Sequence, residues 1–223
     1  EIVYAKGYEI AGDNLVGAEE VLKLAEGADL ILVTLGGKYG TGSIASMGEG
    51  IDATDINLPK CQDDFIQKAA ELGIPMVGVH FGGRPVSSDA ADEKLNALAE
   101  AWTLSEASAE AVGEVLTGEY NPSGKLPVCV AYNAGQIPIY YNHPWGTAWH
   151  LAESIGFPDY VDCPHTPRYF FGHGLSYTSY EYKALKINQK ETRPDTPVEI
   201  SFKVKNTGKY AGTEIAQLYI RDI

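Results

Sequence analysis

Residues 28–37 read Ala-Asp-Leu-Ile-Leu-Val-Thr-Leu-Gly-Gly, a nearly continuous apolar run that is closed by two glycines. A run of this length, bounded by turn residues, is typical of a strand that is buried on both faces of a sheet. Residues 74–79 read Ile-Pro-Met-Val-Gly-Val and form a second such run directly after Gly73. The two runs predict two buried strands in the first half of the chain.

The segments before, between and after these strands have the apolar spacing of helices. Apolar residues recur at helical spacing over 16–26, 62–72 and 105–116, and residues 126–130 read as one more strand. Strands that alternate with helices imply a mainly parallel sheet, because parallel strands need long crossover connections. We therefore predict an α/β fold, with a mainly parallel sheet that has helices on both faces.

The period of the apolar pattern changes near Tyr177. Apolar and polar residues alternate over 180–187, 198–204 and 215–220, which is typical of half-buried antiparallel strands. A β-sandwich needs about seven strands and about 100 residues. The sequence therefore predicts a partial β-sandwich and a chain that is part of a longer polypeptide.

Composition and charge exclude some classes of partner. The chain has 223 residues and a formal net charge of −13, so we expect it to bind neither nucleic acid nor an anionic membrane. No apolar run approaches the roughly 20 residues that span a bilayer. The chain begins with Glu1 rather than Met and has no signal-peptide pattern at that end, which leaves the compartment open. Three cysteines without a CxxC spacing favour a reducing, cytoplasmic compartment over a disulfide framework.

A glycine-rich loop follows the first buried strand and contains Glu49. Ligands bind beyond the carboxyl ends of the strands in open parallel sheets, so Glu49 is either a catalytic carboxyl group or a solvated loop carboxylate. We expect its neighbours Asp52 and Asp55 to orient the loop or to cap the segment that follows it. The pattern from Gly40 to Ala45 formally fits a dinucleotide-binding turn, but the strand ends near Leu35 and no helix is predicted to open there.

Other polar and aromatic residues have competing interpretations. The aromatic cluster could stack on sugar rings or could pack within its own loop, and it contains Tyr140, Tyr141, His143, Trp145, Trp149 and His150. We expect hydrogen-bonded structural roles for His80 and Arg84, and a packing role for Cys61. Trp102 is predicted to lie in the core. The histidines lack the spacing of a metal site, so no metal is expected.

Five segments of the chain are rich in glycine, proline and polar residues at fixed spacings. In chain order they are Gly48-Glu49-Gly50-Ile51-Asp52 with Ile56-Asn57-Leu58-Pro59 and Gln62, then Gly82-Gly83-Arg84-Pro85-Val86, then Gly118-Glu119-Tyr120-Asn121-Pro122-Ser123-Gly124-Lys125-Leu126-Pro127, then Phe171-Gly172-His173-Gly174-Leu175-Ser176-Tyr177-Thr178, and finally Asn206-Thr207-Gly208 with Ala211-Gly212 and Gln217-Leu218-Tyr219. Taken together and in this order, the five segments resemble glycoside hydrolase family 3. One position departs from it, because Ala53 stands where the family usually has Arg. The ion pair that this Arg would make is therefore absent.

The resemblance implies a domain organisation. Residues 1–176 would be the α/β-sandwich domain of the family, and residues 177–223 would be the first part of a fibronectin-III-like domain. The family's catalytic nucleophile is an Asp on a TIM barrel, in a segment like Ser-Asp-Trp. Here Ser88-Asp89 is followed by Ala90 and no barrel surrounds it, so the nucleophile would lie in a TIM-barrel domain elsewhere in the same polypeptide.

The resemblance also implies a function for the whole protein. It would be a retaining, exo-acting β-glycosidase, most simply a β-glucosidase, acting on oligosaccharides or aryl β-glycosides without a cofactor. Glu49 would be the acid/base, and Trp145 and Trp149 would contact the sugar. We expect the chain alone to be inactive. The alternative is a non-catalytic carbohydrate-binding or structural module whose motif residues only maintain the fold.

Overall fold

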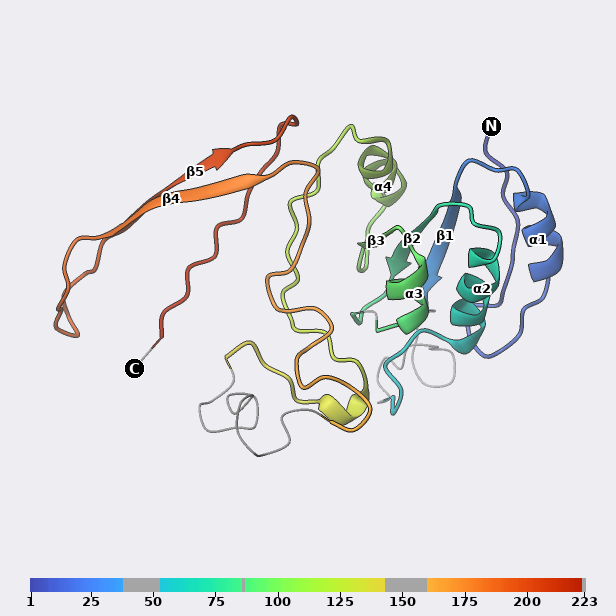
Figure 1. Cartoon of the computed structure of the whole chain (residues 1–223), viewed down its shortest axis with the longest axis horizontal. Helices are drawn as coiled ribbons and strands as arrows, with labels where there is room; N and C mark the ends of the chain where they lie inside the picture. The colour runs from blue at the N-terminus through green and yellow to red at the C-terminus, as the bar shows by residue number, and fades with distance from the viewer. Residues whose placement is uncertain (38–52, 86, 143–159, 222–223) are drawn as a thin grey trace. The chain divides into compact units, whose positions relative to one another are not determined.

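The computed structural model describes residues 1–37, 53–85, 87–142 and 160–221 (Figure 1). The chain divides into two compact units. The first comprises Glu1–Ser108 and Val128–Phe171, and the second comprises Ala109–Pro127 and Gly172–Ile223. No helix in the described residues is both long enough and apolar enough to cross a membrane.

A parallel sheet lies at the centre of the first unit. Its strands are β1 (Ile31–Gly36), β2 (Met76–Phe81) and β3 (Ala97–Glu100), in the spatial order β1-β2-β3. Both neighbouring pairs are parallel, with Ile31 opposite Met76 and Val77 opposite Ala97. The parallel sheet that the two apolar runs predict is therefore confirmed.

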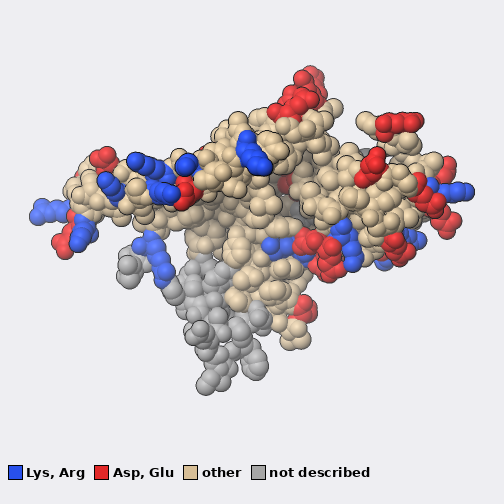
Figure 2. Space-filling view, turned by 45° about the horizontal axis from the view of Figure 1, so that its top comes forward, with Lys and Arg blue, Asp and Glu red and all other residues tan. Residues whose placement is uncertain are grey.

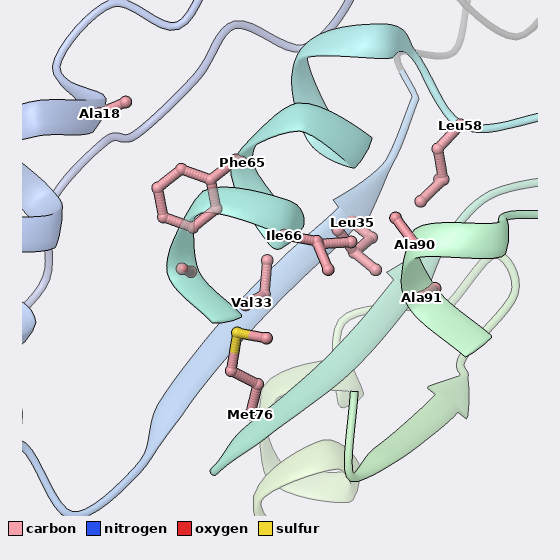
Figure 3. Packing of buried hydrophobic residues seen from close by; sticks show 10 residues of the cluster. Ala18, Val33, Leu35, Leu58, Phe65, Ile66, Met76, Ala90 and Ala91 are labelled. Carbon is pink, nitrogen blue, oxygen red and sulfur yellow. The ribbon is translucent and has the colours of Figure 1, made fainter. Parts of the chain in front are cut away.

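Three helices pack against the core of this sheet. They are α1 (Ala18–Ala25), α2 (Lys60–Ala70) and α3 (Asp89–Lys94). Ile66 of α2 points toward Val33 and Leu35 of β1, and Phe65 lies on the side of α1 (Figure 3). Ile66 is fully buried, and burial of such a side chain contributes about 1.5–3 kcal/mol to stability.

The second unit contains α4 (Ser108–Thr117, whose first residue belongs to the first unit) and a two-stranded antiparallel sheet. The strands are β4 (Tyr180–Ile187) and β5 (Ile200–Asn206), close to the ranges that the alternating pattern predicts. The predicted fold class, an α/β unit with a parallel sheet followed by antiparallel strands, is confirmed.

Two predicted strands are wrong. Residues 126–130 contribute only one isolated bridge, between Val130 and Tyr169, because Pro127 has no N–H to give to a ladder. Residues 215–220 have no strand in the described structure, although they alternate in the sequence. Alternation shows which face of a strand would be buried, but a strand also needs a neighbour for its backbone groups.

A buried arginine fastens residues 128–171 to α3 within the first unit. The Arg168 side chain is only 4% exposed, and its guanidinium forms ion pairs with Asp89 and Asp92. Its Nε donates to the Ser87 hydroxyl at 3.2 Å, and its Cζ lies 4.2 Å from the centre of the Tyr132 ring. Breaking such a pair leaves charge without a partner, so Arg168 fixes where this segment lies on α3.

The pairing of β4 and β5 contains a bulge. Lys183 is opposite Lys203 and Lys186 is opposite Ser201, so β4 has one residue more than β5 between these pairs. Ala184 lies in the bulge with a φ of 54°, which is left-handed backbone that favours glycine.

We expect Ala184→Gly to raise the free energy of unfolding by about 0.5–1 kcal/mol, because it relieves the left-handed strain while losing some chain entropy. Chemical denaturation measures the change. The matched control is Ala111→Gly on the exposed face of α4, which should lower stability by about 1 kcal/mol. Equal losses in both variants would contradict a strained bulge.

Burial affects one acidic group between α2 and α3. Burial raises the pKa of Asp63 above its ordinary value, and this outweighs the hydrogen bond from the Ser88 hydroxyl, which lowers it. The folded state therefore binds the Asp63 proton more tightly than the unfolded state does. The ionised carboxylate costs stability near neutral pH, and this cost disappears as the pH falls below the unfolded pKa.

We therefore expect the stability advantage of Asp63→Asn over the wild type to be largest at about pH 7 and to shrink toward about pH 4. The measurement is the free energy of unfolding of both proteins across this range. A difference that grows as the pH falls would mean that the hydrogen bond from Ser88, rather than burial, dominates the titration of Asp63.

Candidate functional site

The carboxyl ends of the three parallel strands form the frame of the candidate site. These ends are Gly36 of β1, Phe81 of β2 and Glu100 of β3. Glu49, the predicted acid/base, lies outside the described residues, between β1 and α2 in the sequence. The described residues on both sides of that segment define where it starts and where it ends.

The upstream side is fixed by Gln62 of α2. Its Oε1 accepts a hydrogen bond from the N–H of Gly36 at 2.9 Å, and its Nε2 donates to the carbonyl of Gly36 at 2.6 Å. Gln62 is 1% exposed, so both backbone groups depend on this side chain. Gly36 has a φ of 127°, and a Cβ there would lie 1.9 Å from the carbonyl oxygen of Phe81. Only glycine fits at this point.

The downstream side is fixed by a turn that precedes α2. Oδ1 of Asp55 accepts hydrogen bonds from the backbone N–H of Asn57 at 2.9 Å and from its side-chain Nδ2 at 2.8 Å. Asn57 forms a bridge with Ser87, and Leu58 is 5% exposed. Asp55 therefore caps the segment that follows the loop, which is one of the two roles predicted for it. Asp52 lies outside the described residues, and Ala53 is exposed.

A polar pair of one buried and one partly buried side chain joins the ends of β2 and β3. Nδ1 of His80 lies 2.9 and 3.0 Å from the two carboxylate oxygens of Glu100, and the His80 side chain is fully buried. Glu100 also accepts a hydrogen bond from the N–H of Trp102 at 3.1 Å, where the chain turns with a φ of 53°. The hydrogen-bonded structural role predicted for His80 is confirmed. Trp102 is half-buried and does not lie in the core, contrary to the prediction.

Glu100 is a residue that sequence reasoning missed. His80 and Glu100 are opposite each other in the parallel register of β2 and β3, which brings their side chains together. Residues 97–100, Ala-Leu-Ala-Glu, give no clear strand pattern, and without that strand the register could not be deduced. Ser88 gives a signal that could have identified α3, because its hydroxyl accepts a hydrogen bond from the N–H of Ala91 as an N-cap.

The predicted sugar-binding residues Trp145 and Trp149 lie outside the described residues, as do His143 and His150. Two neighbours of this cluster are described. Tyr140 and Tyr141 are 60% and 58% exposed, and the Tyr141 ring stacks on Phe171 with 4.6 Å between the ring centres.

The surroundings of Cys61 are those of a packed residue, and the described residues offer no metal site. The Cys61 thiol is buried and donates to the carbonyl of Glu9 at 3.1 Å, and burial raises its pKa. The predicted packing role of Cys61 is confirmed, because a raised pKa disfavours the nucleophilic thiolate. Within the described ranges, no group of three or more His, Cys, Asp or Glu residues could hold a metal ion. The glycines of the dinucleotide pattern, Gly40 and Gly42, lie outside these ranges.

We expect Gln62→Leu to lower the free energy of unfolding by about 2–4 kcal/mol, because the N–H and C=O of Gly36 would be left buried without partners. Chemical denaturation measures the loss. Gln67→Leu on the exposed side of the same helix is the matched control and should change stability by less than about 0.5 kcal/mol. Similar losses in the two variants would show that Gln62 contributes helix propensity rather than an anchor for Gly36.

Comparisons with known proteins identify the family of this fold. Residues 9–177 match the family model described as "Glycosyl hydrolase family 3 C-terminal domain". The chain is 33% identical over 245 residues to a periplasmic beta-glucosidase of Salmonella typhimurium, which covers all of this chain and 31% of that protein. It is 30% identical over 222 residues to a beta-xylosidase of Formosa agariphila, covering all of this chain and 29% of that protein.

A solved structure shares the fold. The beta-glucosidase of Listeria innocua, crystallised in complex with gluconolactone, superposes with a TM-score of 0.80 at 29% identity, over 95% of this chain and 28% of that chain. The chain thus spans less than a third of each of these three relatives. Because the family model matches most of its length, the chain belongs to glycoside hydrolase family 3 and contains the C-terminal domain of that family.

Proposed function

We propose that this chain supplies the acid/base carboxyl group, Glu49, of a retaining, exo-acting β-glycosidase. The substrate would be a terminal β-linked sugar, most simply glucose, of an oligosaccharide or an aryl β-glycoside. The observation that carries the proposal is the combination of family membership with the segment Gly48-Glu49-Gly50, which follows the carboxyl end of β1. Relatives named beta-glucosidase and beta-xylosidase support the substrate class.

Retention of configuration requires two carboxyl groups about 5–5.5 Å apart, one as nucleophile and one as acid/base. Asp89, the carboxylate in the sequence Ser88-Asp89, is not suited to the role of nucleophile. It is the first residue of α3, and its carboxylate already forms an ion pair with Arg168. We propose that the nucleophile is an Asp on a TIM barrel elsewhere in the same polypeptide.

The anchors on both sides of the Glu49 segment support the proposed role. A general acid must be held close to the leaving oxygen, and a loop can do this only if its ends are fixed. Gln62 fixes the start at Gly36, and Asp55 fixes the turn that leads into α2. Contact with the sugar would raise the pKa of Glu49 and keep it protonated for the first step.

The remaining assignments complete the proposal. Trp145 and Trp149 would contact the apolar face of the sugar, as aromatic side chains do in ligand pockets. Residues 1–176 would form the α/β-sandwich domain, and residues 177–223 would begin a fibronectin-III-like domain. The alternative is a non-catalytic carbohydrate-binding or structural module, and it predicts no catalytic effect of changing Glu49.

We expect Glu49→Ala, in the polypeptide that also contains the barrel, to lower kcat for aryl β-glucosides by about 10²–10⁴-fold. The loss should be smaller for a substrate with a good leaving group, which needs little protonation. Azide should restore turnover and yield a β-glucosyl azide, because it can attack the glycosyl-enzyme without a general base. Rates and product configuration are measured by absorbance and NMR.

The matched control is Glu71→Ala, which removes an exposed glutamate next to α2 and should leave kcat unchanged. The 223-residue chain without the barrel should give no turnover at all. Wild-type rates for Glu49→Ala would support the non-catalytic alternative, and an α-glucosyl azide would exclude retention.

A further inference from the structure

One face of the β4–β5 sheet carries four lysines. The register places Lys183 opposite Lys203, Glu181 opposite Lys205, and Lys186 opposite Ser201. Opposite residues of an antiparallel pair share a face, and positions two apart along a strand lie on the same face. We call Lys183, Lys186, Lys203 and Lys205 the lysine face, and all four side chains are exposed.

The other face of the same sheet is apolar. It carries Tyr182, Phe202 and Val204, and the rings of Tyr182 and Phe202 stack with 6.0 Å between their centres. Antiparallel sheets pack one face on a core and leave the other to solvent. In the fibronectin-III-like sandwich proposed for this part of the chain, the aromatic face would be covered, and the lysine face would remain available to a partner.

The bulge brings Lys186 onto the lysine face. Lys183 and Lys186 are three positions apart, so in a regular strand they would point to opposite faces. The extra residue in β4 between them places both lysines on the same face of the sheet. Ala184 adopts its left-handed φ of 54° at this point. The backbone is therefore strained where it aligns the two lysines.

The charges on the lysine face oppose folding. Lys183 lies directly opposite Lys203, and like charges in this arrangement are destabilising. Glu181 lies 2.8 Å from Lys183, but an exposed pair of this kind contributes little. Among the residues that the structure describes, Lys186, Lys203 and Lys205 form no ion pair. An anionic partner would relieve this repulsion.

The lysine face also contrasts with the rest of the sequence. Residues 177–223 hold eight Lys and Arg against six Asp and Glu, a net charge of +2, whereas residues 1–176 hold nine against 24, a net charge of −15. Figure 2 shows Lys and Arg side chains gathered over the part of the chain that contains β4 and β5. Basic residues are therefore concentrated in one part of an acidic chain.

We propose that the lysine face binds a polysaccharide that carries carboxylates, such as a uronic-acid polymer. The face is an extended strip on two strands rather than a pocket, and it suits a linear polymer with a charge on each sugar. Its six facing residues include no aromatic side chain, whereas proteins that bind single-stranded nucleic acid stack bases on aromatic rings. The proposed glycosidase function guides only the choice of a polysaccharide, and the binding does not require Glu49.

The test is binding of polygalacturonate to the chain at low ionic strength, measured by affinity electrophoresis. We expect retardation that weakens as salt is added, since the contacts are exposed charges. The variant Lys183→Gln/Lys186→Gln/Lys203→Gln should weaken binding about tenfold or more. The matched control Lys23→Gln/Lys68→Gln/Lys94→Gln makes the same change in net charge on exposed helical positions of the first unit and should bind as the parent does.

Several outcomes would overturn the proposal. They are equal retardation by a neutral polysaccharide, unchanged binding in the lysine-face variant, an equal loss in the control variant, and tighter binding to a single-stranded oligonucleotide or to anionic vesicles. Circular dichroism checks that each variant is folded, and removing the repulsion between Lys183 and Lys203 should not lower its stability. Binding by Glu49→Ala separates the two proposals, because it should equal that of the parent even if Glu49 proves not to be catalytic.

Discussion

The side-chain amide of Gln62 gives the backbone of Gly36 the two hydrogen bonds that it needs where β1 leaves the sheet. Gly36 lies so close to Phe81 that no side chain fits there, and its own amide groups are buried. The same helix places Ile66 and Phe65 in the core. Core packing and the fixed start of the Glu49 segment are therefore coupled, because a shift of α2 would change both.

A second set of polar contacts fixes the position of α3 in the first unit. Ser88 caps α3 and donates to Asp63 of α2, while Arg168 bonds to the Ser88 carbonyl and to the Asp89 carboxylate. Apolar packing alone would let α3 slide, since it contributes only alanines to the core. These directional bonds between three distant parts of the sequence give the short helix one position.

The sequence predicted β1, β2, β4 and β5, whose patterns are strong, and missed β3, whose pattern is weak, but alternation over 215–220 also predicted a strand that the described structure does not contain. The apolar runs of β1 and β2 sufficed because strands buried on both faces need apolar residues at nearly every position. The strand β3 was not predicted because two of its four residues are alanine, which gives no clear strand pattern. The candidate site was predictable only through resemblance, since spacing alone left Glu49 as either a catalytic or a solvated group. The His80–Glu100 pair depends on a register that no local pattern encodes.

On the strands β4 and β5, folding constrains the residues of one face and leaves those of the other face free to vary. In the fibronectin-III-like sandwich proposed for this part of the chain, burial of Tyr182 and Phe202 would require an apolar residue at every second position, and it would place no demand on the residues between them. Neutral polar residues on the outer face would serve folding as well and would avoid the repulsion between Lys183 and Lys203. The strained Ala184 adds Lys186 to that face at a further cost in stability. Lysines that folding does not require, and in part opposes, point to a contact outside the fold.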